Sequence, residues 1–384
     1  MLKKTVAVIT VLLLCCALAL IVRGEGCLIA REQDLMLGNL KSLDSAEVLA
    51  LKQERKASDR AFLSLSYGGF GLPVYDEASG TSLFCKQMSN QITVGKNISC
   101  EIGSIADESG VTILAYDRVS FRTYRVEWTT LPIICLQPVG LPLAKSIDRD
   151  LHRGIVTTFD SETGEARQRM ALLRTRGNSS MQYPKAAYLM KFVDLKTGGE
   201  ESASLLGLSE NTEYALNSLY EDGTKIRDFA SLSLWNAIRG DARDTARLYA
   251  IDFVYAEVFV GGVYAGLYGF QESTNLASFG LANTGNISLF NPDSHRIPQM
   301  DTLPASGEEW DEINLEETTQ EKPWTFLGSA LENMFYREGD DFQSELFQSF
   351  DRDSFVDYTI WCNLLYASDN LWKNMLLLAD QRDP

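Results

Sequence analysis

Short segments of alternating polar and apolar residues between residues 67 and 270 constrain the fold more than any other feature of the sequence. In the segment Phe121–Trp128, apolar side chains alternate with charged ones. The runs Ile251–Val260 and Val263–Phe270 flank a Gly-Gly pair, which is typical of a tight hairpin turn. A period of two is that of a half-buried antiparallel strand. We therefore predict short antiparallel strands throughout this region.

Helical patterns are predicted mainly towards the C-terminus. One helix is expected over residues 226–239, with Gly240 as its stop, and residues 324–378 are mostly helical in pattern. Strands followed by helices favour an α+β unit with two lobes. The predicted organisation is an N-terminal membrane anchor or signal segment (1–24), a polar juxtamembrane stalk (25–66), a small β domain (67–130) and a larger α+β domain (131–384).

The N-terminus carries an uncharged run, Thr5–Val22, which follows Lys3 and Lys4. Its eighteen residues would span about 27 Å as a helix, which is enough to cross a hydrocarbon core. Small residues at Ala17 and Ala19 leave a cleaved signal peptide open as the alternative. We predict a membrane anchor with an extracytoplasmic domain, and a secreted protein as the alternative.

The charge balance excludes one large class of partners. The chain has 35 Lys and Arg against 52 Asp and Glu, a net charge of −17. Nucleic-acid binding needs clustered cations that neutralise phosphates, so we predict no nucleic-acid partner. With only two histidines, the chain has no His-rich metal site. Eight acids fall within Asp301–Glu321, which is predicted to be a solvated loop.

The first candidate for chemistry lies near the C-terminus, where Asp369 and Asn374 are five residues apart. They follow a helix predicted to begin at Ser354 and precede a strand predicted from Met375. Kinase catalytic loops need an Asp that receives the proton of the acceptor hydroxyl and an Asn, five residues on, that binds a metal ion. Lys373 would neutralise the transferring phosphoryl group. The alternative is an ordinary Asp/Asn turn.

The second candidate is a predicted strand that leads into a turn rich in Gly and Ser and then into a strand that bears Lys. Backbone amides and hydroxyls of such a turn donate to phosphate oxygens, and cations supply charge. The alternatives are that Arg176 pairs with a surface acid and that Lys191 faces solvent rather than a cleft. The residues assigned to phosphate binding are Arg174, Arg176, Gly177, Ser179, Ser180, Lys185 and Lys191.

Three segments together resemble the spore coat protein H (CotH) kinase-like family. They are RGNSS…PKAAYLMKF, YAEVFVGGVYAGLYGFQE and DRDSFVDYTIWCNLLYASDNLWKN, in that order. The resemblance extends from about residue 131 to residue 378. It implies a bilobed, atypical protein-kinase-like domain that binds ATP with Mg²⁺. It also implies transfer of the γ-phosphate to Ser or Thr of exported, surface or spore-coat proteins.

The resemblance also implies residue roles. Asp369 would be the catalytic aspartate and Asn374 a metal ligand. Either Lys185 or Lys191 would be the nucleotide lysine, and Glu272 would lie near the adenine-side connection between the lobes.

The sequence departs from the family pattern after the proposed catalytic loop. A second metal-binding Asp is expected roughly a dozen residues beyond the Asn, but only ten residues follow Asn374. We therefore expect a kinase-like domain that is incomplete at its C-terminus. The alternative function is a non-catalytic envelope or spore-surface scaffold with a degenerate kinase-like fold.

Overall fold

The computed structural model describes residues 35–139, 150–177, 179–240, 251–279, 281, 287–292, 310–312, 327–331, 340–371 and 374–380. The chain divides into two compact units. The first comprises Met1–Glu201, Ala215–Leu219 and Val254–Phe270, and the second comprises Ser202–Tyr214, Tyr220–Phe253 and Gln271–Pro384.

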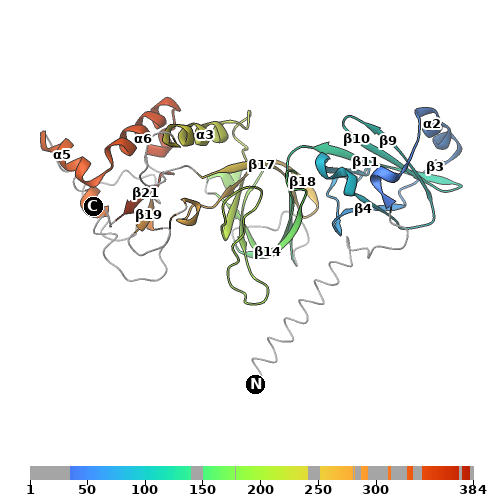
Figure 1. The fold of residues 1–384 in the computed structure, drawn as a ribbon, viewed down its shortest axis with the longest axis horizontal. Coiled ribbons are helices and arrows are strands. Elements are labelled where there is room, and N and C mark those ends of the chain that lie inside the picture. Colours follow the sequence, from blue (N-terminus) through green and yellow to red (C-terminus); the bar gives the residue numbers. More distant parts are fainter. Residues whose placement is uncertain are drawn as a thin grey trace, which may run out of the picture. The chain divides into compact units, whose positions relative to one another are not determined.

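The first part of the first unit is a pair of β-sheets (Figure 1). One sheet has the order β1-β8-β4-β5, and the other has the order β2-β9-β10-β11-β7-β6 with β3 paired to β11. Buried side chains from both sheets, such as Leu63 and Val126, share one core. The strands are β1 (Leu35–Met36), β2 (Lys41–Ser42), β3 (Lys56–Ala57), β4 (Leu63–Tyr67), β5 (Phe70–Gly71), β6 (Val74–Asp76), β7 (Thr81–Cys85), β8 (Thr93–Lys96), β9 (Glu101–Asp107), β10 (Gly110–Tyr116) and β11 (Ser120–Thr129).

One α-helix, α2 (Ser45–Glu54), connects strands of these two sheets. A capping box sets its start. The Asp44 carboxylate accepts from the backbone N–H of Glu47 at 2.8 Å, and the Glu47 carboxylate accepts from the backbone N–H of Asp44 at 2.9 Å. The two contacts satisfy N–H groups that have no partner inside the helix.

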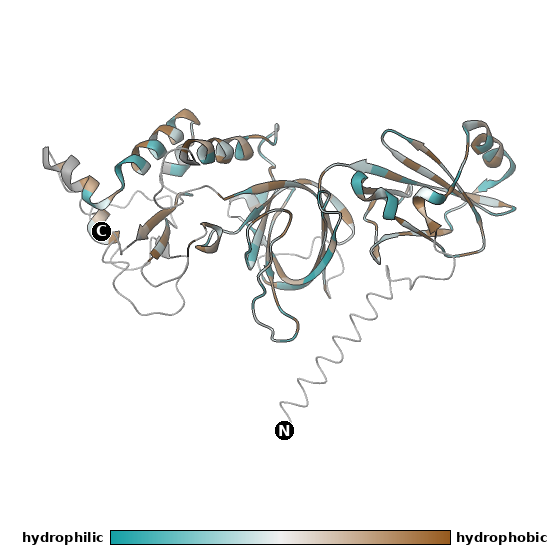
Figure 2. Ribbon diagram, viewed as in Figure 1, coloured by the Kyte–Doolittle hydropathy of each residue, from teal (hydrophilic) through white to brown (hydrophobic). Residues whose placement is uncertain are grey.

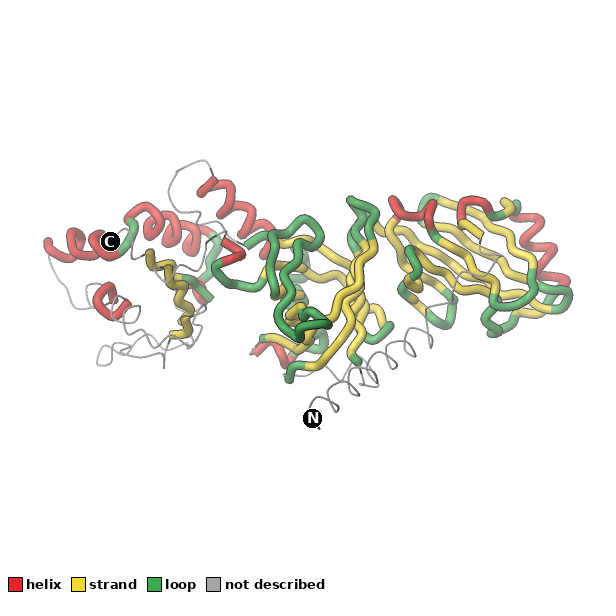
Figure 3. Tube along the Cα trace, turned by 60° about the horizontal axis from the view of Figure 1, so that its bottom comes forward, coloured by secondary structure: helices red, strands yellow, loops and turns green. Residues whose placement is uncertain are grey.

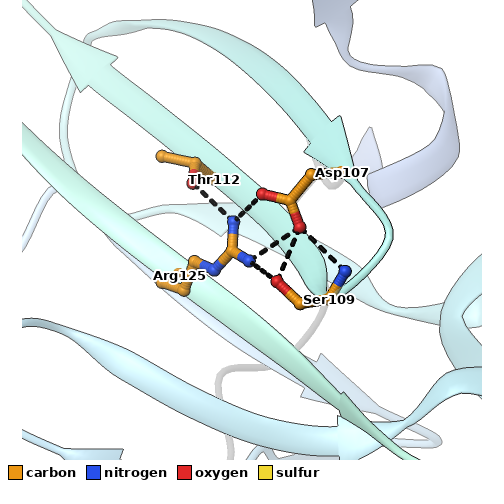
Figure 4. A network of polar contacts seen from close by, with 4 residues as sticks. All are labelled: Asp107, Ser109, Thr112 and Arg125. Carbon is orange, nitrogen blue, oxygen red and sulfur yellow. Dashed lines mark hydrogen bonds and ion pairs between the residues drawn. The ribbon is translucent and has the colours of Figure 1, made fainter.

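Arg125 ties the β9–β10 turn to β11, as Figure 4 shows. Its guanidinium donates to both carboxylate oxygens of Asp107, at 2.8 and 2.9 Å, and to Thr112 Oγ1 at 3.0 Å. Ser109 Oγ also lies 2.7 Å from Asp107. The hydrogen bond from Arg125 is the main reason that the pKa of Asp107 is held well below its ordinary value of 3.8.

Asp107→Asn should therefore lower the stability of the protein at neutral pH and should matter much less in acid. A group with a lowered pKa stabilises the fold above its unfolded pKa, and this contribution is lost as the pH falls through the folded value. The check is the urea midpoint of both proteins at neutral pH and below 3.8. Asp59→Asn is the control, since Asp59 has no ion pair among the described residues. A deficit of equal size at both pH values would contradict the prediction.

The second part of the first unit is built around a closed seven-stranded barrel with the order β12-β13-β14-β15-β16-β18-β17 (Figures 1 and 3). It closes because β12 pairs in parallel with β17. Alternate positions along its strands, such as Ile134, Val156 and Val258, are at most 2% exposed and fill the interior. The strands are β12 (Ile133–Pro138), β13 (His152–Phe159), β14 (Ala166–Arg176), β15 (Ala187–Phe192), β16 (Glu213–Asn217), β17 (Phe253–Val260) and β18 (Val263–Glu272).

This architecture corrects the predicted fold class. An α+β, bilobed kinase-like domain was expected, but the described residues are mostly β and include a closed barrel. The strands themselves were expected, including the β17–β18 hairpin. The closing pair of β12 and β17 is far apart in sequence, and no local pattern indicates that pairing. Local periodicity identifies strands but not their long-range partners.

The structure also contradicts the predicted membrane attachment through a helix. Within the described ranges, no helix is long and apolar enough to cross a bilayer. The run Thr5–Val22, on which the anchor and the membrane-anchored localisation depended, lies outside those ranges. Neither the anchor nor that localisation is retained.

The paired sheets and the barrel are packed on each other within the first unit. Phe84 of β7 meets Phe159 of β13 edge-on, with ring centroids 5.1 Å apart. Tyr67 of β4 donates to the carbonyl of Gly164 at 2.6 Å. The same core cluster contains residues from both sheets and from β12, β13 and β17. The two β parts therefore share a continuous hydrophobic core.

The second unit contains helices and a small sheet. The helices include α3 (Arg227–Gly240), α5 (Asp340–Ser349) and α6 (Arg352–Leu364), and the sheet has the order β20 (Trp310–Glu312), β19 (Ile287–Pro292), β21 (Leu377–Asp380). Hydrophobic and hydrophilic residues are intermixed along α3 and α6 in Figure 2. Trp235 and Trp361 join the two helices, with centroids 5.8 Å apart. Most of the acidic segment Asp301–Glu321 lies outside the described residues, and residues 310–312 form a strand rather than the predicted loop.

Candidate functional site

The turn after β14 requires glycine at position 177. Gly177 has a φ of +107°, a conformation that side chains rarely adopt. A Cβ added there would lie 2.0 Å from Ser180 Oγ, so Ser180 would also have to change its rotamer. The short 3₁₀ helix η4 (Ser179–Gln182) follows, and the side chain of Ser179 lies outside what the structure describes.

Three predicted cations share one face of β14 and β15. Lys191 lies opposite Leu172, Arg174 opposite Leu189, and Arg176 at the end of the same ladder. Directly paired residues lie on the same face of a sheet, and residues two apart on a strand do as well. The positions between them on β14 are the buried residues Ala171, Leu173 and Thr175. Arg174, Arg176 and Lys191 therefore lie on the outward face, opposite the barrel interior.

An ion pair with Glu200 holds the ammonium group of Lys191. Glu200 is placed by an antiparallel bridge to Val193, immediately after β15. The pair is partly exposed, with 33% of the Lys191 side chain accessible. Sequence reasoning did not identify Glu200, because a single acid in a polar loop gives no signal of its partner.

Lys185 is bound to β18 instead. Its Nζ donates to the carbonyl of Leu267 at 2.5 Å and lies 4.1 Å from the centroid of the Tyr268 ring. Gly266, next to Leu267, has a φ of +101°, a conformation that favours glycine. Tyr268 in turn donates to the carbonyl of Ala186 at 2.9 Å, and burial raises the pKa of Tyr268. Lys185 thus fastens the turn to the barrel.

Glu272 is a buried carboxylate at the end of β18, with 1% of the residue exposed. It accepts from the backbone N–H of Ser209 at 2.6 Å. Burial raises the pKa of Glu272 above its ordinary value, and the hydrogen bonds from Ser209 oppose that rise. Nearby, Asn211 donates to Ser278 Oγ at 2.8 Å and accepts from Asn275 at 2.9 Å. Glu272 therefore anchors the loop before β16.

The helix that precedes the proposed catalytic loop begins at Arg352, two residues before its predicted start at Ser354. Asp351, not Ser354, is the N-cap of α6, and its carboxylate accepts from the backbone N–H of Ser354 at 2.7 Å. At the other end, the backbone N–H of Ala367 bonds the carbonyl of Cys362 at 2.8 Å, which closes the helix. Between them, Tyr366 has a φ of +54° and is 91% exposed. Glycine is usual at such a position.

Tyr366→Gly should stabilise the protein by about 1 kcal/mol, because it relieves a left-handed backbone conformation and removes no buried contact. Urea unfolding followed by tryptophan fluorescence would measure the gain. Tyr366→Ala is the matched control, since it removes the ring but keeps the Cβ that causes the strain. Equal effects of the two substitutions would contradict this explanation.

Asp369 lies on the 3₁₀ helix η6 (Ser368–Leu371), directly after α6. Tyr358 of α6 donates to the carbonyl of Asn370 at 2.6 Å, and the Asn370 side chain donates to the carbonyl of Asn374 at 3.3 Å. Asn374 is exposed and has a φ of +55°. Lys373 and the side chain of Asp369 lie outside the described residues. Tyr358 thus connects the helix to the loop.

The predicted site residues fall into two groups. The phosphate-binding residues belong to the first unit, whereas Glu272, Asp369, Lys373 and Asn374 belong to the second. That the two groups meet in one site remains a prediction. Among the described residues, no three His, Cys, Asp or Glu come together, and the side chain of Asp369 lies outside them, so Asn374 stays a predicted metal ligand.

Comparison with known proteins bears on these two groups of residues together. No curated protein matches the sequence. The model of the CotH kinase protein family matches residues 173–384, more than half of the chain. The matched region begins on β14, so it includes the cations of the outward face, the Gly177 turn and the loop that carries Asp369. The predicted resemblance is confirmed, and the chain belongs to the CotH kinase protein family.

Proposed function

We propose that this protein is an atypical protein kinase that transfers the γ-phosphate of ATP to Ser or Thr residues of exported, surface or spore-coat proteins. The observation that supports it is the shared outward face of Arg174, Arg176 and Lys191 on the two strands that the Gly177 turn connects. Arg176 adjoins the turn, and Lys191 lies farther along the ladder, opposite Leu172. Three cations along one face suit a polyphosphate, whose oxygens accept charge-assisted hydrogen bonds.

In this proposal, Lys191 rather than Lys185 is the nucleotide lysine. The ammonium group of Lys185 is engaged by the Leu267 carbonyl and the Tyr268 ring. Lys191 lies on the same face as the two arginines and is held by Glu200. Protein kinases orient their nucleotide lysine with a glutamate in the same way.

The second group of residues would carry the transfer itself. ATP supplies the phosphoryl group, and Asp369 would receive the proton of the acceptor hydroxyl. Lys373 would neutralise charge on the phosphoryl oxygens, and Asn374 would supply an oxygen ligand to the Mg²⁺ that binds with ATP. Tyr358 would act as a positioning residue, through its hydrogen bond to Asn370. Glu272 would hold the loop at Ser209 rather than contact the nucleotide.

Calorimetric titration of the full chain with ATP tests the phosphate-binding face. Lys191→Ala should weaken binding by about tenfold or more, which corresponds to one charge-assisted contact. The control is Arg167→Ala on the neighbouring strand β14, where Arg167 pairs with Glu165 at 2.5 Å. It should leave the affinity unchanged. Absence of ATP binding by the unmodified protein, or an equal loss in both variants, would refute the assignment.

The alternative function is a non-catalytic scaffold. Two of the residues assigned to the nucleotide, Lys185 and Glu272, are engaged in contacts that hold the fold together. The described residues also contain no cluster of metal ligands. Measurable phosphotransfer that depends on Asp369 would exclude this alternative.

A further inference from the structure

The paired sheets carry a cluster of cations in a protein whose net charge is −17. Two segments, residues 52–60 and 116–122, contain six cations and three acids. They lie side by side, because the backbone N–H of Lys56 bonds the carbonyl of Val119 at 3.0 Å and that of Ser58 bonds Phe121 at 2.9 Å. We name this surface the basic edge. Its cations are Lys52, Arg55, Lys56, Arg60, Arg118 and Arg122.

Most of these cations lack an acidic partner. Among the described residues, only Arg55 of the six forms an ion pair, at 3.3 Å with the exposed Glu54. The Asp117 carboxylate is already used, since it accepts from the backbone N–H groups of Val119 and Ser120 at 2.8 and 2.7 Å. Arg125, on the same strand as Arg122, differs from them, because its guanidinium forms an ion pair with Asp107 (Figure 4).

The basic edge is also held in place before any ligand arrives. Arg55 lies 5.0 Å above the Tyr116 ring and donates to the carbonyl of Asp117 at 2.7 Å. Arg122 lies 5.3 Å above the Tyr124 ring and donates to the carbonyl of Asp59 at 2.7 Å. Cations fixed on aromatic rings lose little conformational entropy on binding, which favours recognition of an anionic partner.

The same surface favours a polypeptide over a nucleic acid. Tyr116 and Tyr124 are each only 8% exposed and are covered by the arginines, so they offer no face on which bases stack. The surface has an open strand edge instead, because β3 pairs with β11 alone. The N–H groups of Lys56 and Ser58 point to β11, so the backbone of the exposed Ala57 between them faces the open side. Val119, 71% exposed, adds an apolar side chain beside Arg118 and Lys56. An extended peptide adds to such an edge through its backbone.

We propose that the basic edge binds an extended, acidic polypeptide segment alongside β3. The surface lies outside the region that the family model matches, so the proposal does not depend on kinase activity. Carboxylates of the partner would contact Lys56, Arg118 and their neighbours, and its backbone would pair with the free side of β3. Such binding weakens with added salt, because the contacts are exposed.

Fluorescence anisotropy of a labelled peptide of alternating Glu and Thr, titrated with the full chain at low and high salt, tests the proposal. The double variant Lys56→Glu, Arg118→Glu should weaken binding by about tenfold or more. The control is Lys86→Glu, an exposed lysine that follows β7 at the far end of β11, with the same change of charge per residue. This control should change the affinity by less than about twofold, because salt screens the interaction of a distant charge with the peptide.

Several results would overturn the proposal: no binding by the unmodified protein at low salt, an equal loss in Lys86→Glu, or equal binding of a Gln and Thr peptide. Tighter binding of single-stranded DNA than of the acidic peptide would assign the surface to nucleic acid and also overturn it. If the double variant unfolds, Arg118→Gln decides, since Arg118 is exposed and has no ion pair among the described residues.

Discussion

Phe159→Ala is expected to lower the free energy of unfolding of the first unit by about 3–5 kcal/mol. Phe159 is 1% exposed at the end of β13, and its ring meets Phe84 at 5.1 Å and Tyr67 at 6.5 Å. It belongs to the core cluster that the paired sheets share with the barrel. Truncation would remove apolar contacts from both β parts at once and leave a cavity that neither can easily fill.

Urea unfolding, followed by far-ultraviolet circular dichroism, measures this loss. Phe229→Ala on α3 is the matched control, because Phe229 is 43% exposed and its truncation should cost much less. If the shared core couples the two β parts, the Phe159 variant should also unfold in separate steps. An effect as small as that of Phe229→Ala would show that the contact between the sheets and the barrel contributes little.

The strands could be predicted from sequence, but the barrel could not. Alternation along Phe121–Trp128 and the Gly-Gly turn after Val260 identify β11 and the β17–β18 hairpin. The closure of the barrel depends on the parallel pairing of Ile133–Leu136 with Glu257–Val260, and nothing in either segment specifies the other. A lobed α+β domain was the wrong conclusion from a correct set of strands.

Sequence patterns predict the presence of a helix better than the residue at which it begins. The helix α6 was predicted to begin at Ser354, whereas its N-cap is Asp351. Asp and Ser have nearly equal preference for the N-cap, so composition alone does not choose between neighbours.

The residue types of the candidate site could be predicted from the sequence, but the contacts that these residues make could not. Sequence reasoning assigned Lys185 and Lys191 the same possible role, because both follow the glycine turn. The structure separates them, since the first binds the Leu267 carbonyl of a strand distant in sequence and the second pairs with Glu200. These partners are set by the barrel, whose closure the sequence does not reveal.

Asp369→Asn is expected to lower the rate of phosphotransfer by about 10²–10⁴-fold, if the proposed kinase activity is correct. Asparagine is close to aspartate in size but does not accept the proton of an attacking hydroxyl. ATP affinity should stay nearly unchanged, because the residues proposed to grip the phosphates, such as Lys191, lie on β14 and β15. A loss of rate without a loss of affinity would separate a catalytic role from a binding role.

The measurement is transfer of labelled phosphate from ATP to a Ser/Thr acceptor protein, alongside calorimetric titration with ATP. Ser368→Ala is the control, since it alters the neighbouring residue of η6 and leaves the carboxylate in place. Transfer by Asp369→Asn at the unmodified rate would remove Asp369 from the mechanism. Retained ATP binding with no transfer by the unmodified protein would favour the scaffold, because the phosphate-binding face would then act without a catalytic loop.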